Sequence, residues 1–226
     1  MAGEMIKTEA ICLDIRAWSQ TSHVVSWLTP SGKVTTVVKG AVRPKSFFLG
    51  QYDLNYTCEI LYYARARGEV HALREAAPLA RRDALRGDYR ALALAGYFRR
   101  LAAELAPGGP DAADWYDLLG GALDALAGGA AKPLAELLAY ETAALELLGL
   151  KPALGEEGGV LTLRGERRIP VSSAVASALA APRAERNADF LIDAARVIGV
   201  YYAFHVDCAS DVRRSVLTLI SRTQAR

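Results

Sequence analysis

The spacing of the apolar residues changes near residue 80, and this change limits the possible folds more than any other feature of the sequence. Before it, apolar residues alternate with polar ones, which is the period of a β-strand. After it, Ala- and Leu-rich segments follow the period of a helix. The two periods together predict an α+β protein with a β-domain in residues 1–80 and an all-α helical domain in residues 81–226.

Five segments of the β-domain have the character of short strands: residues 6–16, 23–28, 33–38, 54–63 and 70–76. Turn sequences separate them, such as Thr29-Pro30-Ser31-Gly32 and Arg67-Gly68. Five strands in fewer than 80 residues, with a longer connection between the third and the fourth, favour a small closed barrel of the OB-fold type. An open β-sandwich is the alternative that this pattern leaves.

The helical domain is predicted to contain helices at residues 83–106, 110–128, 133–148, 172–181, 187–208 and 210–221. Asn187 and Ser210 are the expected N-caps of the last two, because their side chains can accept hydrogen bonds from the first turn. Between the third and fourth helices, the stretch GEEGGVLTLRGERRIP predicts a short hairpin near residues 155–170.

The composition excludes several classes of protein. Cys12, Cys58 and Cys208 are odd in number and far apart, so we expect no disulfide framework, no metal site and no cofactor. The first residues lack the apolar run of a signal peptide, and no segment approaches the ~20 apolar residues of a membrane span. We therefore expect a cytoplasmic protein. Motifs of the common enzyme classes, such as GxxxxGK(S/T) and GxSxG, do not occur, which favours a protein that is not an enzyme.

Basic residues gather in a stretch that contains no carboxylate. The net charge of +2 is too small to indicate nucleic-acid binding by the chain as a whole, so the position of the charges matters. Between Asp14 and Asp53 there is no acidic residue, and five cations lie in this interval: Arg16, Lys33, Lys39, Arg43 and Lys45. A row of cations can follow a phosphate backbone and release its counterions. The stretch therefore predicts nucleic-acid binding.

The expected local structure would align these cations. On a strand, Lys33 and Lys39 would share one face about 20 Å apart. Gly40 would end that strand, and Arg43-Pro44-Lys45 is expected as an extended loop. Some of the aromatic residues in the same region could stack on bases, although most are expected in the barrel core: Trp18, Trp27, Phe47, Phe48 and Tyr52.

A second basic feature opens the helical domain. Arg82, Arg86 and Arg90 recur every four residues, so on one helix they would share a face. A solvated helix face explains this spacing as well as function does. The functional interpretation is that a nucleic acid would continue from the barrel onto these arginines.

Several segments resemble the RecO family of bacterial recombination mediators. They occur in matching order along nearly the whole chain: IKTEAICLDIR, KVTTVVKGAVRPKS, HALREAAP and YETAALELLGLKPAL. The resemblance implies an N-terminal OB-fold and a C-terminal helical domain. It also implies binding of single- and double-stranded DNA, annealing of complementary strands, and association with the nucleoid when DNA is bound.

The resemblance further implies partners and site residues. With RecR, such a protein helps to replace single-strand binding protein by RecA, and it binds the acidic, phenylalanine-ended tail of single-strand binding protein. Carried over by position, Lys33, Lys39, Arg43 and Lys45 are DNA-binding candidates, together with Arg16. The sequence does not place the site for the tail; candidate cations are Arg99, Arg100, Arg196, Arg213 and Arg214.

One departure from the family concerns metal. Many RecO proteins carry a four-cysteine zinc module between the third helix and the later ones. Residues 151–170 of this chain contain no cysteine, so we expect that site to be absent and the hairpin either to be held by packing or to be mobile. An alternative function also stays open: a protein-interaction adaptor whose basic barrel face binds an acidic partner protein.

Overall fold

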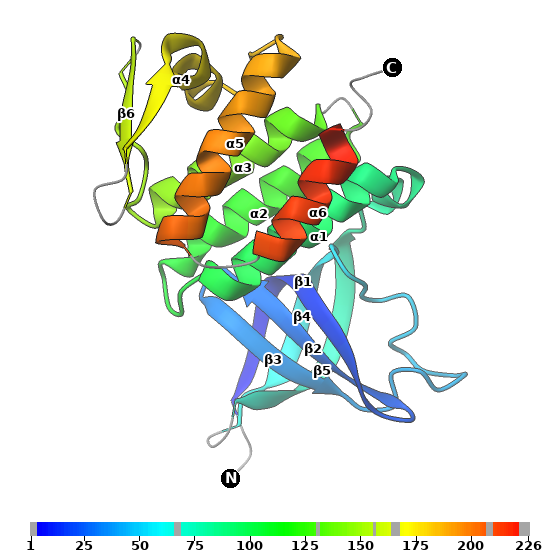
Figure 1. Cartoon of the computed structure of the whole chain (residues 1–226). Helices are drawn as coiled ribbons and strands as arrows, with labels where there is room; N and C mark the ends of the chain where they lie inside the picture. Colours follow the sequence, from blue (N-terminus) through cyan, green and yellow to red (C-terminus); the bar gives the residue numbers. More distant parts are fainter. Residues whose placement is uncertain are drawn as a thin grey trace. The chain divides into compact units, whose positions relative to one another are not determined.

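The computed structural model describes residues 4–65, 69–129, 132–155, 157–163, 168–206 and 210–221 (Figure 1). These residues form two compact units. The first contains Met1–Asp83 and Ala102–Leu123, and the second contains Ala84–Leu101 and Asp124–Arg226. The first unit holds a β-barrel and the second is mainly helical, which confirms the predicted α+β class.

The barrel consists of five strands: β1 (Met5–Ser19), β2 (Ser22–Thr29), β3 (Gly32–Val38), β4 (Thr57–Tyr63) and β5 (Val70–Ala80). Its strand order is β1-β2-β3-β5-β4, and β4 pairs with β1 to close the sheet. The β3–β5 pairing is parallel, whereas the other pairings are antiparallel. This closure confirms the OB-fold and excludes the open sandwich.

The barrel core is mainly apolar and includes a buried polar contact between Trp27 and Thr36. Trp27 is fully buried, and its Nε1 donates to Oγ1 of the buried Thr36 at 2.9 Å, so the indole N–H keeps a partner inside the core. Cys12 and Cys58 are buried free thiols in this core. Burial raises the pKa of Cys58 to about 12, which keeps its thiol protonated. Cys208 lies outside the described residues.

The first predicted helix is wrong in one respect. Residues 83–106 do not form a single helix but the 3₁₀ turn η1 (Asp83–Gly87) followed by α1 (Tyr89–Leu105). The break lies at Asp88, whose carboxylate accepts hydrogen bonds from the backbone N–H groups of Arg90 and Ala91. An Asp in this position caps a new helix, and Gly87 just before it is a poor helix former.

The remaining elements follow the sequence closely. They are α2 (Ala112–Ala127), α3 (Pro133–Leu147), β6 (Gly158–Thr162), β7 (Arg168–Ser172), α4 (Ser173–Ala180), α5 (Ala188–His205) and α6 (Ser210–Ser221). Asn187 caps α5 as predicted, since its side chain accepts from Asp189 N at 2.9 Å. Ser210 begins α6, but its side chain lies outside the described part of the chain. Within the described ranges, no helix combines the length and apolarity that crossing a membrane requires.

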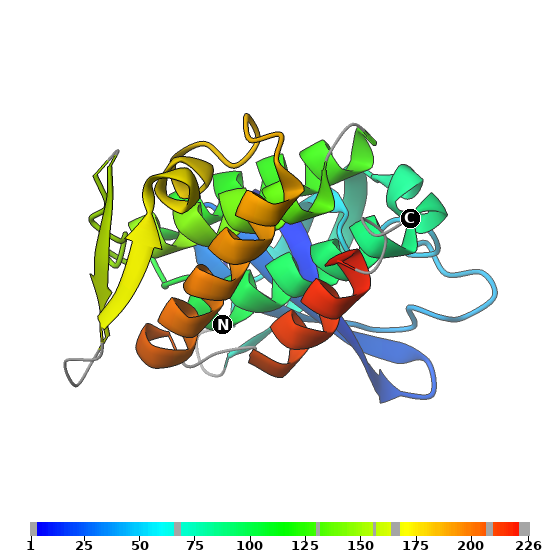
Figure 2. The ribbon, with the colours of Figure 1, turned by 45° about the horizontal axis from the view of Figure 1, so that its top comes forward.

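Strands β6 and β7 form the predicted hairpin beside α4 (Figure 2). Leu161 and Val171 face inward and are buried, at 3% and 5% exposure. The hairpin is therefore held by apolar packing, which is one of the two alternatives left open by the absence of cysteine from residues 151–170.

A buried ion pair and its hydrogen bonds connect four helices of the second unit. Glu141 on α3 is fully buried and accepts two hydrogen bonds from Arg213 on α6, at 2.7 and 2.9 Å. Arg213 also donates to the carbonyl of Ala195 on α5 at 2.8 Å. Tyr97 on α1 donates to the same carboxylate at 2.7 Å. Gly199 on α5 faces the guanidinium so closely that a Cβ there would collide with it.

Replacing Glu141 by Gln would leave the Arg213 guanidinium buried without a counter-charge. Breaking a buried pair on one side costs about 3–5 kcal/mol, and we expect Glu141→Gln to lower the free energy of unfolding by about that amount in urea denaturation. Glu136→Gln is the matched control, because Glu136 is also buried on α3 and paired, but its partner Arg183 is 61% exposed. Rehydration of Arg183 should limit that loss to about 1 kcal/mol. Equal losses would contradict the prediction.

Candidate nucleic-acid interface

The connection between β3 and β4, residues 39–56, carries the exposed cations. We call it the β3–β4 loop. Lys39, Arg43 and Lys45 are all exposed, and none of the three forms an ion pair with a described residue. No carboxylate occurs in the loop before Asp53. The loop therefore presents three positive charges to solvent without local neutralisation.

The loop runs through consecutive turns and is not extended as expected. Gly40 adopts a φ of 68°, and a Cβ at this position would lie 3.3 Å from Cδ of Arg43. The N–H of Arg43 donates to Gly40 O, and that of Ser46 donates to Arg43 O at 2.9 Å. Pro44 thus lies at the second position of a turn, which its fixed φ suits. These turns bring Lys39, Arg43 and Lys45 onto a short, folded segment.

Several contacts hold the β3–β4 loop on the barrel. Tyr52 is buried, and its hydroxyl lies 2.8 Å from Nδ1 of His23 on β2. Arg81 donates to Gly50 O at 3.0 Å. Near the start of the loop, Val42 N donates to Thr21 O in the β1–β2 turn at 3.3 Å. The cations are therefore displayed from a segment with fixed ends, which lowers the entropy lost when a ligand binds.

Lys33 and Arg16 differ from the three loop cations because each has a partner of its own. Lys33 is near the start of β3, whereas Lys39 follows its end, and the Lys33 ammonium donates to Ala103 O at 3.0 Å. Arg16 is exposed on β1 but pairs with the carboxylate of Asp14. The structure thus groups Lys39, Arg43 and Lys45 and leaves the other two cations with partners of their own.

The arginines that open the helical region do not share one helix face. Arg82 lies in a left-handed turn, with a φ of 52°, before η1, while Arg86 is in η1 and Arg90 is in α1. The shared face predicted from their spacing is therefore wrong, because the helix is broken at Asp88. Their role as DNA contacts stays a prediction.

Arg82 is also bonded to the barrel. It is half-buried, and its guanidinium donates to Asn55 O at 2.8 Å and to Thr57 Oγ1 at 2.9 Å. Arg90, in contrast, lies over the ring of Tyr89 at 5.4 Å, and Arg86 is exposed. The Arg82 side chain thus joins segments of the first unit that are far apart in the sequence.

The aromatic residues of the basic region separate into two groups. Trp27 and Tyr52 belong to the core, and Phe48 packs against it while partly buried. Trp18 and Phe47 are each 69% exposed. Their side chains are therefore available to a ligand, and the sequence alone gave no means of telling these two from the buried ones.

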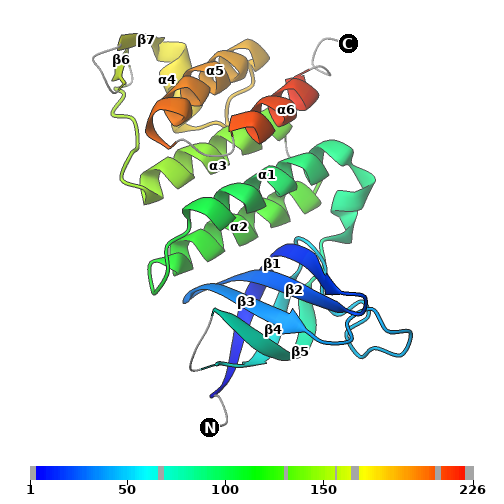
Figure 3. The ribbon, with the colours of Figure 1, turned by 60° about the horizontal axis from the view of Figure 1, so that its bottom comes forward.

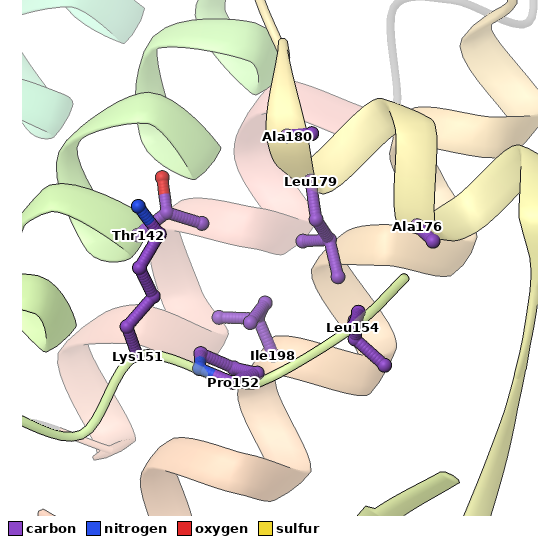
Figure 4. Close-up of a pocket in the computed structure, with 8 residues that line it drawn as sticks. All are labelled: Thr142, Lys151, Pro152, Leu154, Ala176, Leu179, Ala180 and Ile198. Carbon is purple, nitrogen blue, oxygen red and sulfur yellow. The ribbon is translucent and has the colours of Figure 1, made fainter. Parts of the chain in front are cut away.

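The second unit contains a small apolar cavity of about 100 Å³ (Figure 4). Its lining comes from α3, α4, α5 and the segment after α3: Thr142, Lys151, Pro152, Leu154, Ala176, Leu179, Ala180 and Ile198. Lys151 brings the only charge of this lining, and its ammonium pairs with the Glu146 carboxylate at 2.9 Å. Both side chains of that pair are 59% exposed.

Two of the cations considered for the acidic tail form ion pairs within the second unit. Arg213, one of the cations considered for an acidic tail, is buried in its pair with Glu141. Arg196, another of them, pairs with Asp193 on the surface of α5. Within the described ranges, no three His, Cys, Asp or Glu side chains lie together as a metal ion would require.

Two protein-family models match the chain. "Recombination protein O N terminal" matches residues 1–82, and "Recombination protein O C terminal" matches residues 86–159. The first match contains the barrel and the β3–β4 loop. The second contains α1, α2 and α3 and ends before α4.

Curated relatives named "DNA repair protein RecO" match as well. The protein of Roseiflexus sp. (strain RS-1) is 33% identical over 76% of this chain and 61% of its own length. That of Anaeromyxobacter sp. (strain K) is 30% identical over 67% of this chain and 59% of its own length. A third, from Anaeromyxobacter dehalogenans, is 31% identical over 66% of this chain and 58% of its own length. The chain thus spans about three fifths of the length of these relatives.

The bonds of Arg82 predict that this residue supports the barrel itself. Arg82→Ala removes a charged donor from Asn55 O and Thr57 Oγ1, and we expect it to lower the free energy of unfolding by about 2 kcal/mol without any ligand. Arg43→Ala is the control, since it removes the same charge from an exposed position and should change stability by less than about 0.5 kcal/mol. Urea denaturation of both variants measures the difference. An Arg82→Ala protein as stable as Arg43→Ala would disprove the structural role.

Proposed function

Because this chain belongs to the RecO family, we propose that it binds single- and double-stranded DNA and anneals complementary strands in recombinational DNA repair. Together with RecR, it helps to replace single-strand binding protein by RecA. In this proposal the protein acts in the cytoplasm, at the nucleoid, and catalyses no reaction. Its function is to screen the phosphate charge while the bases of two complementary strands form pairs.

The observation that carries the proposal is the group of cations on the β3–β4 loop. OB-folds bind oligonucleotides on one barrel face and the loops that border it. Here Lys39, Arg43 and Lys45 stand on a loop that contacts the β1–β2 turn, with no ion pair to a described residue to lower their charge. Lys33 and Arg16 would extend the phosphate contacts along the barrel. The arginines at 82, 86 and 90 are weaker candidates, Arg82 least of all, because its guanidinium is engaged with the barrel.

An adaptor that binds an acidic protein through the same loop is the second candidate. It rests on the same positive charge, since a basic surface also speeds association with acidic partners. The two candidates differ in what they predict for an oligonucleotide. DNA binding through phosphates predicts that log K for the oligonucleotide falls linearly with log salt. The adaptor predicts that the oligonucleotide does not bind.

The proposal predicts a defined salt dependence. With about four phosphates neutralised on single-stranded DNA, log K should fall with log salt at a slope of roughly −3. The double variant Lys39→Ala/Arg43→Ala should bind more weakly and show a slope shallower by about one unit or more, because two contacts are lost. Fluorescence anisotropy with a labelled oligonucleotide at several salt concentrations measures both quantities.

The matched control removes two exposed cations from the second unit. Arg196→Ala/Arg214→Ala lowers the net charge by the same amount, so an effect of overall charge would appear in both double variants. We expect the control to keep the slope of the unaltered protein. A folded Lys39→Ala/Arg43→Ala protein with unchanged affinity and slope would favour the adaptor.

The cavity of the second unit is our candidate for the tail of single-strand binding protein. That tail is acidic and ends in phenylalanine, so it requires an apolar recess beside a cation. The cavity offers an apolar lining with Lys151 at its edge. Glu146 competes for this ammonium, since the two side chains pair in the absence of a partner.

This competition gives opposite expectations for two variants. Lys151→Ala should raise the Kd of a labelled tail peptide about 2- to 5-fold, the range of an exposed ion pair, and Glu146→Gln should lower it by a similar factor. Isothermal titration with the cognate peptide measures both. A peptide without the final phenylalanine should bind weakly to all forms. If the two variants change the Kd in the same direction, the tail does not bind at Lys151.

A further inference from the structure

Trp18 and Phe47 are the most exposed large hydrophobic side chains in the part of the chain that the structure describes. Each keeps 69% of its surface in water. Leaving an aromatic ring exposed forfeits about 25 cal/mol for each Å² that burial would remove from water. Both rings belong to the longest acid-free interval of the chain, between Asp14 and Asp53. Their exposure therefore points to a ligand that is both apolar and negatively charged.

Trp18 is placed by an irregularity of β1. In the pairing with β2, Ala17 lies opposite His23 and Ser19 lies opposite Ser22, so Trp18 is an extra residue on its strand. Such a β-bulge turns a side chain away from the direction that regular alternation would give it. The bulge lies at the end of the β1–β2 hairpin, beside the turn that contacts the β3–β4 loop.

Phe47 is supported by a chain of aromatic contacts that begins in the core. The buried Trp27 packs edge-on against Tyr52 at 6.0 Å between ring centroids. Tyr52 contacts Phe48 at 6.4 Å, and Phe48 contacts Phe47 at 6.1 Å. Each ring restricts the next, so Phe47 is held in solvent by neighbours that are themselves packed.

The two rings stand on segments that are bonded to each other. Gly40 N donates to Ser22 Oγ, and Val42 N donates to Thr21 O, both at 3.3 Å. The end of the β1–β2 hairpin and the β3–β4 loop leave the barrel on the same side (Figures 1 and 3). Lys39, Arg43 and Lys45 belong to this loop, so cations and exposed rings are combined at one end of the barrel.

We propose that Trp18 and Phe47 stack on unpaired bases of single-stranded DNA whose phosphates lie along Lys39, Arg43 and Lys45. This inference rests on the proposed DNA binding and adds to it a means of preferring single strands. Phosphates are available on single strands and duplexes alike, so the cations serve both. Base faces are free only where bases are unpaired, because duplex bases already stack on each other. The rings therefore contribute to single-strand affinity alone.

The test compares two ligands and several substitutions. Single-stranded and duplex oligonucleotides of equal length are titrated by fluorescence anisotropy against Trp18→Ala, Phe47→Ala and the unaltered protein. Stacking is worth about 1–3 kcal/mol per base, so each substitution should raise the single-strand Kd about 5- to 150-fold. The duplex Kd should change less than twofold. The salt slope should stay the same, because no phosphate contact is lost.

Conservative variants separate stacking from simple apolar contact. Trp18→Phe retains a ring and should keep most of the single-strand affinity, whereas Trp18→Leu retains apolar area without a ring and should lose it. Both residues are exposed, so the variants are expected to fold, which circular dichroism verifies. If an alanine variant is unstable, the leucine variant at the same position replaces it in the comparison of single-strand and duplex Kd values.

The outcomes distinguish this inference from the proposed function. Unchanged single-strand affinity in Trp18→Ala and Phe47→Ala, with weakened binding in Lys39→Ala/Arg43→Ala, overturns stacking and leaves DNA binding in place. Equal losses for single strands and duplex overturn the preference for single strands. An unaltered protein that binds neither oligonucleotide overturns both proposals. A loss confined to single strands and restored by Trp18→Phe supports the stacking of bases on these rings.

Discussion

Parallel pairing of β3 with β5 is the constraint on which the first unit depends. Three residue pairs, from Thr35–Val70 to Val37–Ala72, join these strands and close the sheet. Parallel strands cannot be joined by a tight turn, so the chain must travel away from β3 before it returns as β4. The β3–β4 loop is the path it takes. Closure of the barrel therefore produces the segment on which the candidate interface is built.

The loop meets two requirements that usually oppose each other. Binding residues must be exposed, yet a loose segment loses conformational entropy when it binds. Here Tyr52 is buried and Gly50 O accepts from Arg81, while Lys39, Arg43 and Phe47 stay in solvent. The same aromatic core that stabilises the barrel supports the exposed ring of Phe47. Stability and proposed function thus share their contacts instead of competing for residues.

In the second unit, a pair of opposite charges is buried between helices instead of being exposed to solvent. Glu141 and Arg213 are buried and bonded to each other, to Tyr97 and to Ala195 O, so their charges organise the packing of α1, α3, α5 and α6. Desolvation offsets much of the attraction within a buried pair, so the pair adds little net stability, although removing one partner is costly. The cations of the β3–β4 loop, in contrast, have no such partner among the described residues, and their charge is available to a ligand.

The sequence alone determined the features that depend on local order. Periodicity located the five strands and most of the helices, turn residues located their ends, and an acid-free interval drew attention to Lys39, Arg43 and Lys45. The strands, helices and turns follow from neighbours within a few residues, which is the range over which period, capping and turn chemistry act. The break at Asp88 was missed because a single helical period fits residues 83–106 equally well.

Only the tertiary structure decided which individual side chains are buried, exposed or paired. Arg82 and Arg43 are both arginines beside basic stretches, and the sequence does not distinguish their roles. In the closed barrel, Arg82 donates to Asn55 O, whereas Arg43 is exposed to solvent. Trp27 is buried and Trp18 is exposed, although both belong to the β1–β2 hairpin. Glu141 meets Arg213 across 72 residues of sequence. Burial and pairing of a side chain depend on contacts with segments that are distant in the sequence, and local sequence patterns do not specify those contacts.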